Sequence, residues 1–296
     1  MHLERAFPFS QDENSPVTNL SLDLWDSAAT EISAPQLSED WEFAYENGIL
    51  TGSRDGRFMG YLQEAGGAWL DRKTDRIIGW EMDAASMPVH SRSKPCALLL
   101  AIWLADRNVQ IIHSGLVSLQ GKGVLLAGSS GSGKTTASLL CHRAGFAFLG
   151  DDFVGIRQSE PDLFEGLCFF HSVRLTPSQL KHFPEFSLHA IDGDEKILFY
   201  LGETEKPLLN RSTRITAIVF PKVAPDKPLR LSTLSKGKAL LQLGYNSLRI
   251  PSYQARIMMN QLAALIEAVP TYELEMEPDM ERIPEKISEI LSGLDL

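Results

Sequence analysis

The sequence is poor in cysteine, has no long apolar run and has no cluster of basic residues. Its three cysteines, Cys96, Cys141 and Cys168, form no C-x-x-C pair and no cysteine–histidine ligand spacing. These absences exclude a disulfide framework and a zinc site of the usual kinds. We expect the cysteines to be small buried side chains in a reducing compartment.

The longest apolar run extends from Cys96 to Ala105. It is far shorter than the roughly 20 residues that span a bilayer, and it predicts a buried helix. The first residues also lack the apolar core of a signal peptide. The formal net charge of −10 disfavours binding to nucleic-acid backbones. We therefore expect a cytoplasmic protein with neither a nucleic-acid nor a membrane partner.

The composition, 44% hydrophobic and 22% charged residues, is typical of a globular protein with a real core. Aromatic and β-branched segments over residues 41–82 predict an antiparallel meander with turns at Gly66–Gly67 and Lys73–Asp75. A strand is expected near residues 18–24, and residues 84–95 have the composition of a linker. The sequence thus predicts a β-rich domain of unknown role over residues 1–94.

From residue 95 onward the apolar pattern alternates between helix and strand periods. It predicts helices over 95–106, 135–144, 254–268 and 284–291, and strands over 109–112, 115–119, 123–127, 146–149, 215–220 and 271–276. A turn is expected at Gly121–Gly123, and Pro221 is expected to end the strand before it. This order predicts an α/β domain over residues 95–296.

A glycine-rich octet lies between the strand 123–127 and the helix 135–144 and matches G-x-x-x-x-G-K-[ST]. Its glycines allow successive backbone N–H groups to point at phosphate oxygens, and the helix that follows adds the positive end of its dipole. In such a loop the lysine reaches the β- and γ-phosphates and the hydroxyl binds Mg²⁺. A chance Gly/Ser-rich loop is the alternative, but the flanking strand and helix favour nucleotide binding. The expected ligands are ATP and Mg²⁺, held by Gly128, Ser129, Ser130, Gly131, Ser132, Gly133, Lys134, Thr135 and Thr136.

Two further motifs flank the octet. Asp151 and Asp152 follow the strand 146–149, close enough along the chain to reach the same phosphates. One carboxylate can hold Mg²⁺ or its waters, and the other can accept a proton from an attacking hydroxyl. His113 ends an apolar strand 21 residues before Lys134 (134 − 113). Each motif has a structural alternative, a surface turn for the aspartates and a core position for the histidine.

Taken together, His113-Ser-Gly, the glycine octet and Leu149-Gly-Asp-Asp152 resemble the HPr kinase/phosphorylase family. The resemblance covers residues 111–157 and implies a P-loop core of the HPr-kinase/PEP-carboxykinase type. It also implies that His113 and Lys134 are catalytic or contact phosphate, that Thr135 and Asp151 lie at the metal, and that Asp152 is the proton acceptor.

The sequence departs from the family at two places. Ser172-Val-Arg174-Leu has no carboxylate where the family has a metal-site glutamate, and the segment tied to the reverse phosphorolysis has no clear counterpart. The pattern looks more like relatives that keep only the kinase core and phosphorylate free serine or a lasso-peptide precursor. The segment 269–274 fits a Val-Pro-x-Tyr-x-Leu motif of those relatives. Arg174, Lys196 and Arg256 are further candidates for holding the substrate or the γ-phosphate.

The leading hypothesis is a kinase that transfers the γ-phosphoryl group of ATP to a serine-type hydroxyl of a peptide, a protein or a small molecule. The alternative is a nucleotide-binding regulatory or assembly protein with little phosphotransfer. An ABC-type or motor ATPase is disfavoured, because the sequence has no LSGGQ-like stretch and no late strand that ends in Asp-Glu. The resemblance is compatible with a homo-oligomer of unspecified size.

Overall fold

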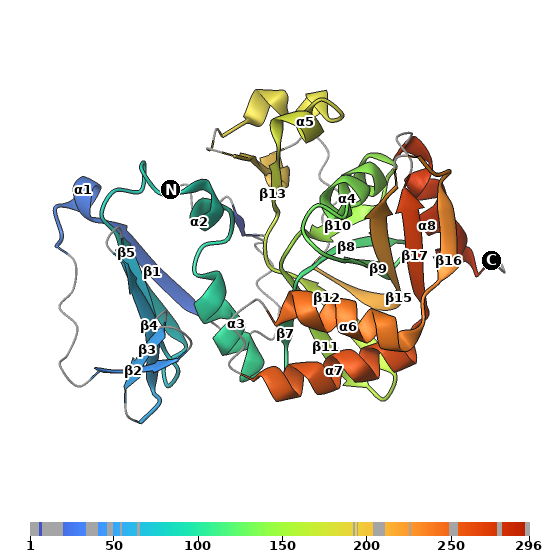
Figure 1. Cartoon of the computed structure of the whole chain (residues 1–296). Helices are drawn as coiled ribbons and strands as arrows, with labels where there is room; N and C mark the ends of the chain where they lie inside the picture. Colours follow the sequence, from blue (N-terminus) through green and yellow to red (C-terminus); the bar gives the residue numbers. More distant parts are fainter. Residues whose placement is uncertain are drawn as a thin grey trace. The chain divides into compact units, whose positions relative to one another are not determined.

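The computed structural model describes residues 6–7, 20–33, 41–45, 50–53, 55–63, 66–191, 193, 195–203, 211–224, 226–248, 254–276 and 280–293. The chain divides into two compact units (Figure 1). The N-terminal unit comprises residues 10–107, and the larger unit comprises residues 1–9 and 108–296. Within the described residues, no helix combines the length and the apolarity needed to cross a membrane.

The N-terminal unit contains a six-stranded sheet in the order β1-β6-β5-β4-β3-β2. Neighbouring strands are antiparallel except β1, which is parallel to β6. The meander predicted over residues 41–82 is therefore present. The strands are β1 (Ser21–Asp26), β2 (Trp41–Tyr45), β3 (Leu50–Ser53), β4 (Phe58–Gln63), β5 (Gly66–Asp71) and β6 (Arg76–Glu81), and the helices are α1 (Ser27–Thr30), α2 (Val89–Ser93) and α3 (Ala97–Ala105).

Two details of this unit differ from the sequence-based expectations. Gly66 and Gly67 are the first residues of β5 and not a turn. A Cβ atom on Gly67 would lie 2.5 Å from the ring of Trp80, so glycine here permits close packing between β5 and β6. The expected linker over residues 84–95 contains the short helix α2.

The helix α3 belongs with the N-terminal sheet and not with the α/β domain that follows it. The Trp103 indole donates a hydrogen bond to Asp75 (2.9 Å), and Arg107 forms an ion pair with the same carboxylate (2.6 Å). Arg72, in the turn after β5, pairs with Asp106 at 2.7 Å. These contacts place the division between the units after Arg107, later in the chain than the expected boundary at residues 94–95.

The larger unit contains a nine-stranded sheet in the order β10-β8-β9-β15-β12-β11-β7, with β17 beside β15 and β16 beside β17. The strands β9 and β17 are parallel to β15, and all other neighbours are antiparallel. The strands are β7 (Gln110–Ile112), β8 (Ser114–Leu119), β9 (Lys122–Ala127), β10 (Ala147–Gly150), β11 (Val154–Glu160), β12 (Leu163–Cys168), β15 (Ser212–Val223), β16 (Arg230–Thr233) and β17 (Thr271–Met276).

Helices cover both faces of this sheet (Figure 1). Val124 and Leu126 of β9 lie in a cluster with α4 and α8, whereas Leu125 and Ala127 lie in a cluster with α6 and α7. Successive side chains of a strand point to opposite faces, so a continuous apolar strand is buried on both. The helices of this unit are α4 (Lys134–Arg143), α5 (Pro177–Leu180), α6 (Lys236–Ser247), α7 (Ala255–Ala268) and α8 (Ile283–Ser292), and a separate two-stranded sheet pairs β13 (Ser172–Leu175) with β14 (Ile197–Tyr200).

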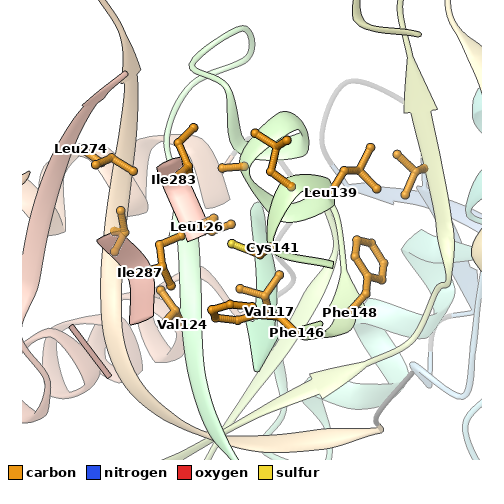
Figure 2. Close-up of a cluster of buried hydrophobic side chains, with 14 of the residues drawn as sticks. Val117, Val124, Leu126, Leu139, Cys141, Phe146, Phe148, Leu274, Ile283 and Ile287 are labelled. Carbon is orange, nitrogen blue, oxygen red and sulfur yellow. The ribbon is translucent and has the colours of Figure 1, made fainter. Parts of the chain in front are cut away.

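The cluster beneath α4 accounts for one of the three cysteines. Cys141 of α4 lies in a buried cluster with apolar side chains of the sheet and with Ile283 and Ile287 of α8 (Figure 2). Burial raises the pKa of its thiol well above the ordinary value, as expected for a packed and unreactive cysteine. All three cysteines are buried and none is in a disulfide.

Two expectations for strand ends in this unit are wrong in detail. The turn between β8 and β9 is formed by Gln120 and Gly121, whose φ values of 51° and 79° fit a two-residue type I′ hairpin. Pro221 does not end its strand, because β15 continues to Val223 and pairs there with β17. A proline in a strand removes one backbone donor but leaves its carbonyl available to the neighbouring strand.

Candidate active site

The topology of the larger unit brings four separate segments to one edge of the sheet. The strand β8 lies between β9 and β10 and is antiparallel to both, so β9 and β10 end at the edge where β8 begins. The strand β15 is parallel to β9 and ends at the same edge. The residues that meet there are His113, the glycine loop 128–135, the pair Asp151–Asp152 and the end of β15.

The glycine loop (Gly128–Thr135) has the backbone that its three glycines allow. Gly128, Gly131 and Gly133 have φ values of 148°, 80° and 101°, which other residues rarely adopt. A Cβ atom on Gly133 would lie 2.1 Å from the methyl group of Met276. The loop then enters α4, whose first residue is Lys134. The backbone amides at the start of α4 therefore have the arrangement that favours an anion.

Lys134 is buried, with 4% of its surface exposed. Its ammonium group donates to the carbonyl oxygens of Gly128 (2.8 Å) and Ser129 (2.9 Å). Burial lowers the pKa of Lys134, and the nearby charge of Lys196 lowers it further, whereas the carboxylates of Asp152 and Asp151 act in the opposite direction. The lysine thus places a buried positive charge directly beneath the loop.

The two aspartates contact different partners. The Thr135 hydroxyl donates to Asp151 Oδ2 at 2.8 Å, and Asp151 is 3% exposed. Gly115 of β8 lies beside this carboxylate, and its lack of a side chain leaves room for α4, since a Cβ atom there would lie only 2.6 Å from the Ser138 hydroxyl. The hydroxyl and the carboxylate are both oxygen ligands of the kind that Mg²⁺ prefers.

Asp152 contacts His113 and Arg174. Its Oδ1 lies 3.2 Å from His113 Nε2, and its Oδ2 accepts from Arg174 Nη2 at 3.4 Å. Each of the three side chains is about a quarter exposed, at 23%, 23% and 25%. Asp152 has a φ of 66°, a left-handed conformation that aspartate tolerates at some cost. A β-bulge between Phe148 and Gly150 precedes the pair, and the two aspartates have different partners.

The remaining candidate residues are distributed around this centre. Ser129, Ser130 and Gly131 are the exposed residues of the loop. Thr136 is buried in the first turn of α4, where its hydroxyl accepts from the Gln179 amide of α5 at 3.4 Å. Arg256 is exposed in the first turn of α7.

A pocket of about 750 Å³ adjoins the glycine loop on its β15 side. Its walls are the loop residues 128–132, the end of β15, one side of α6 and Glu273 of β17. The sequence pattern does not identify the α6 residues as part of a site. Leu241 and Tyr245 are exposed apolar residues, so they lie outside the buried face that hydrophobic periodicity can detect. Their position beside the glycine loop depends on the fold.

The residues present fit a nucleotide with Mg²⁺. The Ser132 hydroxyl is buried in the loop and has no hydrogen-bond partner among the described residues, as expected of a group that faces a phosphate oxygen. In the described part of the chain, no group of three or more His, Cys, Asp or Glu side chains is placed to hold a metal. Mg²⁺ in nucleotide sites is usually bound by one or two protein oxygens together with the phosphates, and Thr135 and Asp151 supply two.

Comparison with known proteins gives little to add to this geometry. No family model and no curated protein matches the chain. Among solved structures, a Hpr(Ser) kinase/phosphatase from Coxiella burnetii aligns with 62% of this chain and 95% of its own, at a TM-score of 0.32 and 12% identity. A TM-score of this size does not define a common fold. The family resemblance of the motifs therefore stays a prediction, and the chemistry of the site rests on its distances.

Proposed function

We propose that this chain is a kinase that transfers the γ-phosphoryl group of ATP to a hydroxyl group. One observation carries the proposal: two adjacent aspartates at the glycine loop have separate partners. Asp151 accepts from Thr135 at 2.8 Å, and Asp152 lies 3.2 Å from His113. Phosphoryl transfer to a hydroxyl needs one carboxylate at the metal and one that accepts the hydroxyl proton.

In the proposed reaction the loop amides and Lys134 hold the β- and γ-phosphates. Asp152 accepts the proton of the acceptor hydroxyl, whose oxygen forms a bond to the γ-phosphorus. The bond from that phosphorus to the β–γ bridging oxygen breaks, and ADP leaves. Thr135 and Asp151 would hold Mg²⁺, which would supply positive charge that stabilises the transferring phosphoryl group. His113 and Arg174 contact the Asp152 carboxylate and would hold it in place.

Asp162 provides a matched control for a test of Asp152. Both are aspartates in the left-handed region, with φ values of 66° and 62°, and Asn is tolerated in that conformation. Asp162 is exposed in the turn between β11 and β12. We expect Asp152→Asn to lower the rate of phosphoryl transfer by about 10²- to 10⁴-fold while the Kd for ATP stays the same. Asp162→Asn should change neither quantity.

The assay uses ATP labelled at the γ-phosphate, Mg²⁺, free L-serine and a library of serine-containing peptides. Equal transfer rates for Asp152→Asn and the wild-type chain would contradict the assigned role. If the wild-type chain binds ATP and labels no acceptor, it is a nucleotide-binding protein with a regulatory or assembly role. One observation favours this second function. Ser172 is a buried serine at the position where the HPr kinase/phosphorylase family, which the motifs resemble, has a metal-site glutamate.

A further inference from the structure

The proposed transfer reaction assigns no ligand to the pocket beside the glycine loop. Its volume of about 750 Å³ lies within the range of sites that hold small molecules or peptide side chains. The expected phosphate site and the Asp152 carboxylate do not require it. The occupant can be inferred from which end of the nucleotide the pocket adjoins and from the side chains in its walls.

The pocket adjoins the γ-phosphate end of the loop. Gly128 and Ser129 line it, and their carbonyl oxygens accept from the Lys134 ammonium. The lysine of such a loop contacts the β- and γ-phosphates. The opposite end, at the first turn of α4, is flanked by α5, where Gln179 contacts Thr136. None of the α5 residues lines the pocket. The nucleoside is therefore expected on the α5 side, and the pocket lies on the side from which an acceptor approaches.

The α6 wall connects the pocket to the proton acceptor. Asn246, which is 5% exposed, lines the pocket, and its amide donates to the Gln242 carbonyl at 2.7 Å. The next residue, Ser247, accepts a hydrogen bond from the backbone N–H of His113 at 3.4 Å. His113 in turn lies 3.2 Å from Asp152. The helix that forms this wall therefore also contacts the backbone of His113, the residue whose side chain lies next to the assigned base.

The walls of the pocket favour an apolar occupant. Leu241, Tyr245 and Val223 are 75%, 69% and 56% exposed, which is unusual for large apolar side chains that line one pocket. The charged residues at its rim, Lys222 and Glu273, lie 3.5 Å apart and pair with each other. A free amino acid carries two opposite charges that need charged partners, and this rim pair is already formed.

We propose that this pocket, the α6 pocket, binds a peptide acceptor through an apolar or aromatic residue next to the phosphorylated serine. The neighbour lies against Leu241 and Tyr245, and the serine hydroxyl reaches Asp152 and the γ-phosphate. Its proton passes to Asp152 as its oxygen bonds to phosphorus and ADP leaves. This inference rests on the proposed kinase function and assigns its acceptor class: a peptide segment and not free serine.

Two labelled pentapeptides test the α6 pocket by equilibrium binding, which does not depend on transfer. One has serine between leucine and phenylalanine, and the other has serine between two aspartates. Fluorescence anisotropy in the presence of a non-hydrolysable ATP analogue gives the Kd of each. We expect the apolar peptide to bind at least about tenfold more tightly, since burying one such side chain is worth about that factor. Free L-serine should not compete at equal concentration.

The variants Leu241→Asp and Tyr245→Ala should each raise the Kd of the apolar peptide about tenfold and leave the Kd for ATP unchanged. Ile257→Asp is the control, because Ile257 is a 42% exposed apolar residue of α7 outside the pocket. Equal binding of the two peptides, or no effect of either pocket variant, overturns the proposal. A rise in the Kd for ATP but not for tripolyphosphate also overturns it, and assigns the pocket to the nucleoside.

Failure of the α6 pocket and failure of the kinase function give different results. The pocket is judged by peptide binding, and the kinase by label transfer to any acceptor. If free L-serine is phosphorylated and neither peptide binds, the kinase function stands and the acceptor assignment fails. If the apolar peptide binds through Leu241 and Tyr245 but no acceptor is labelled, the kinase function fails and the pocket is a peptide-binding site.

Discussion

Asp71 in the N-terminal unit and Lys134 in the larger unit are both buried charges, yet their surroundings differ. Asp71 accepts two hydrogen bonds from the Arg57 guanidinium, at 2.9 and 2.6 Å, and a third from the backbone N–H of Lys73 at 3.0 Å. Lys134 donates at 2.8 and 2.9 Å to two backbone carbonyls, which are neutral. Asp71 thus has an opposite charge as its direct partner, whereas Lys134 has only neutral acceptors at hydrogen-bond distance.

The pKa values of the two groups move according to this difference. The hydrogen bonds from Arg57 lower the pKa of Asp71, so the fold stabilises its charged form. Burial lowers the pKa of Lys134, so the fold disfavours its charged form. A buried charge that the fold satisfies is structural, whereas one that the fold disfavours is placed for a ligand of opposite sign. We therefore propose that Asp71 contributes to stability and that Lys134 binds an anionic ligand.

The largest expected effect comes from removing the charge of Lys134 while keeping its apolar stem. Lys134→Met should raise the Kd for ATP about 100-fold or more, because a buried charge-assisted contact to the phosphates is lost. The folded state should be at least as stable as the wild type, because an unfavourable buried charge is removed. Isothermal titration calorimetry measures the Kd, and urea unfolding followed by far-UV circular dichroism measures stability.

Lys227→Met is the matched control for Lys134→Met. Lys227 is exposed and pairs with Glu275 at 2.9 Å on the surface, where an ion pair contributes little. Its loss should leave the Kd for ATP unchanged. Unchanged ATP affinity in Lys134→Met would refute the assignment of Lys134 to binding, and a marked loss of stability would make it a structural residue like Asp71.

A smaller effect, and on stability alone, is expected at Asp71. Asp71→Asn removes the charge that Arg57 contacts and should destabilise the N-terminal unit by about 2 kcal/mol, the typical worth of a hydrogen bond to a charged group. The Kd for ATP should not change. All five tryptophans lie within residues 10–107, so intrinsic tryptophan fluorescence during urea unfolding reports on this unit.

The Asp71→Asn experiment contains its own control, because the larger unit has no tryptophan. Changes in ATP affinity report on the larger unit, and changes in the tryptophan transition report on the N-terminal unit. If Asp71→Asn changes the Kd for ATP as well as the tryptophan-detected unfolding midpoint, Asp71 and Lys134 do not have separate roles. An unchanged unfolding midpoint would show that the Arg57 pair adds no stability.

The core of the candidate site is predictable from sequence because its parts are local. The strand before the octet, the three glycines and the helix after it follow each other along the chain, and each has a strong local preference. The contact between His113 and Asp152 is harder to predict from the sequence. Their contact depends on β8 lying between β9 and β10, which is a pairing between separate segments, and only the family resemblance indicated it.

The α6 pocket shows why the remaining part could not be predicted. The pattern over Lys236–Ser247 does not predict a helix, because Leu241 and Tyr245 are apolar residues on the exposed side. Hydrophobic periodicity identifies buried faces, and it fails where apolar side chains are exposed. The prediction that β15 ends at Pro221 is wrong for a related reason. Proline indicates a strand end locally, but pairing with β17 extends the strand beyond it.

The smallest expected effect concerns Glu81, a half-buried carboxylate of β6 in the N-terminal unit. Burial and the charge of Asp26 raise its pKa to about 7 from an ordinary 4.5. Because the folded-state pKa is raised, the folded unit binds this proton more tightly than the unfolded chain. The resulting stability is fully present below pH 4.5 and is lost as the pH rises through about 7. Like Lys134, Glu81 is a charge that its surroundings disfavour, but it is only half-buried.

Glu81→Gln should therefore stabilise the N-terminal unit at pH 8 by about 1 kcal/mol, a value reduced from the full pKa shift because solvent screens a half-exposed group. At pH 4.5 the variant and the wild type should unfold at the same urea concentration. Tryptophan fluorescence at the two pH values measures both. Equal stabilisation at both pH values would trace the gain to packing, since Gly66 lies against this carboxylate. A gain confined to pH 8 would show that the ionised Glu81 carboxylate reduces stability, although no ligand site has been assigned there. An unfavourable charge would then indicate a binding site only where it is buried as deeply as that of Lys134.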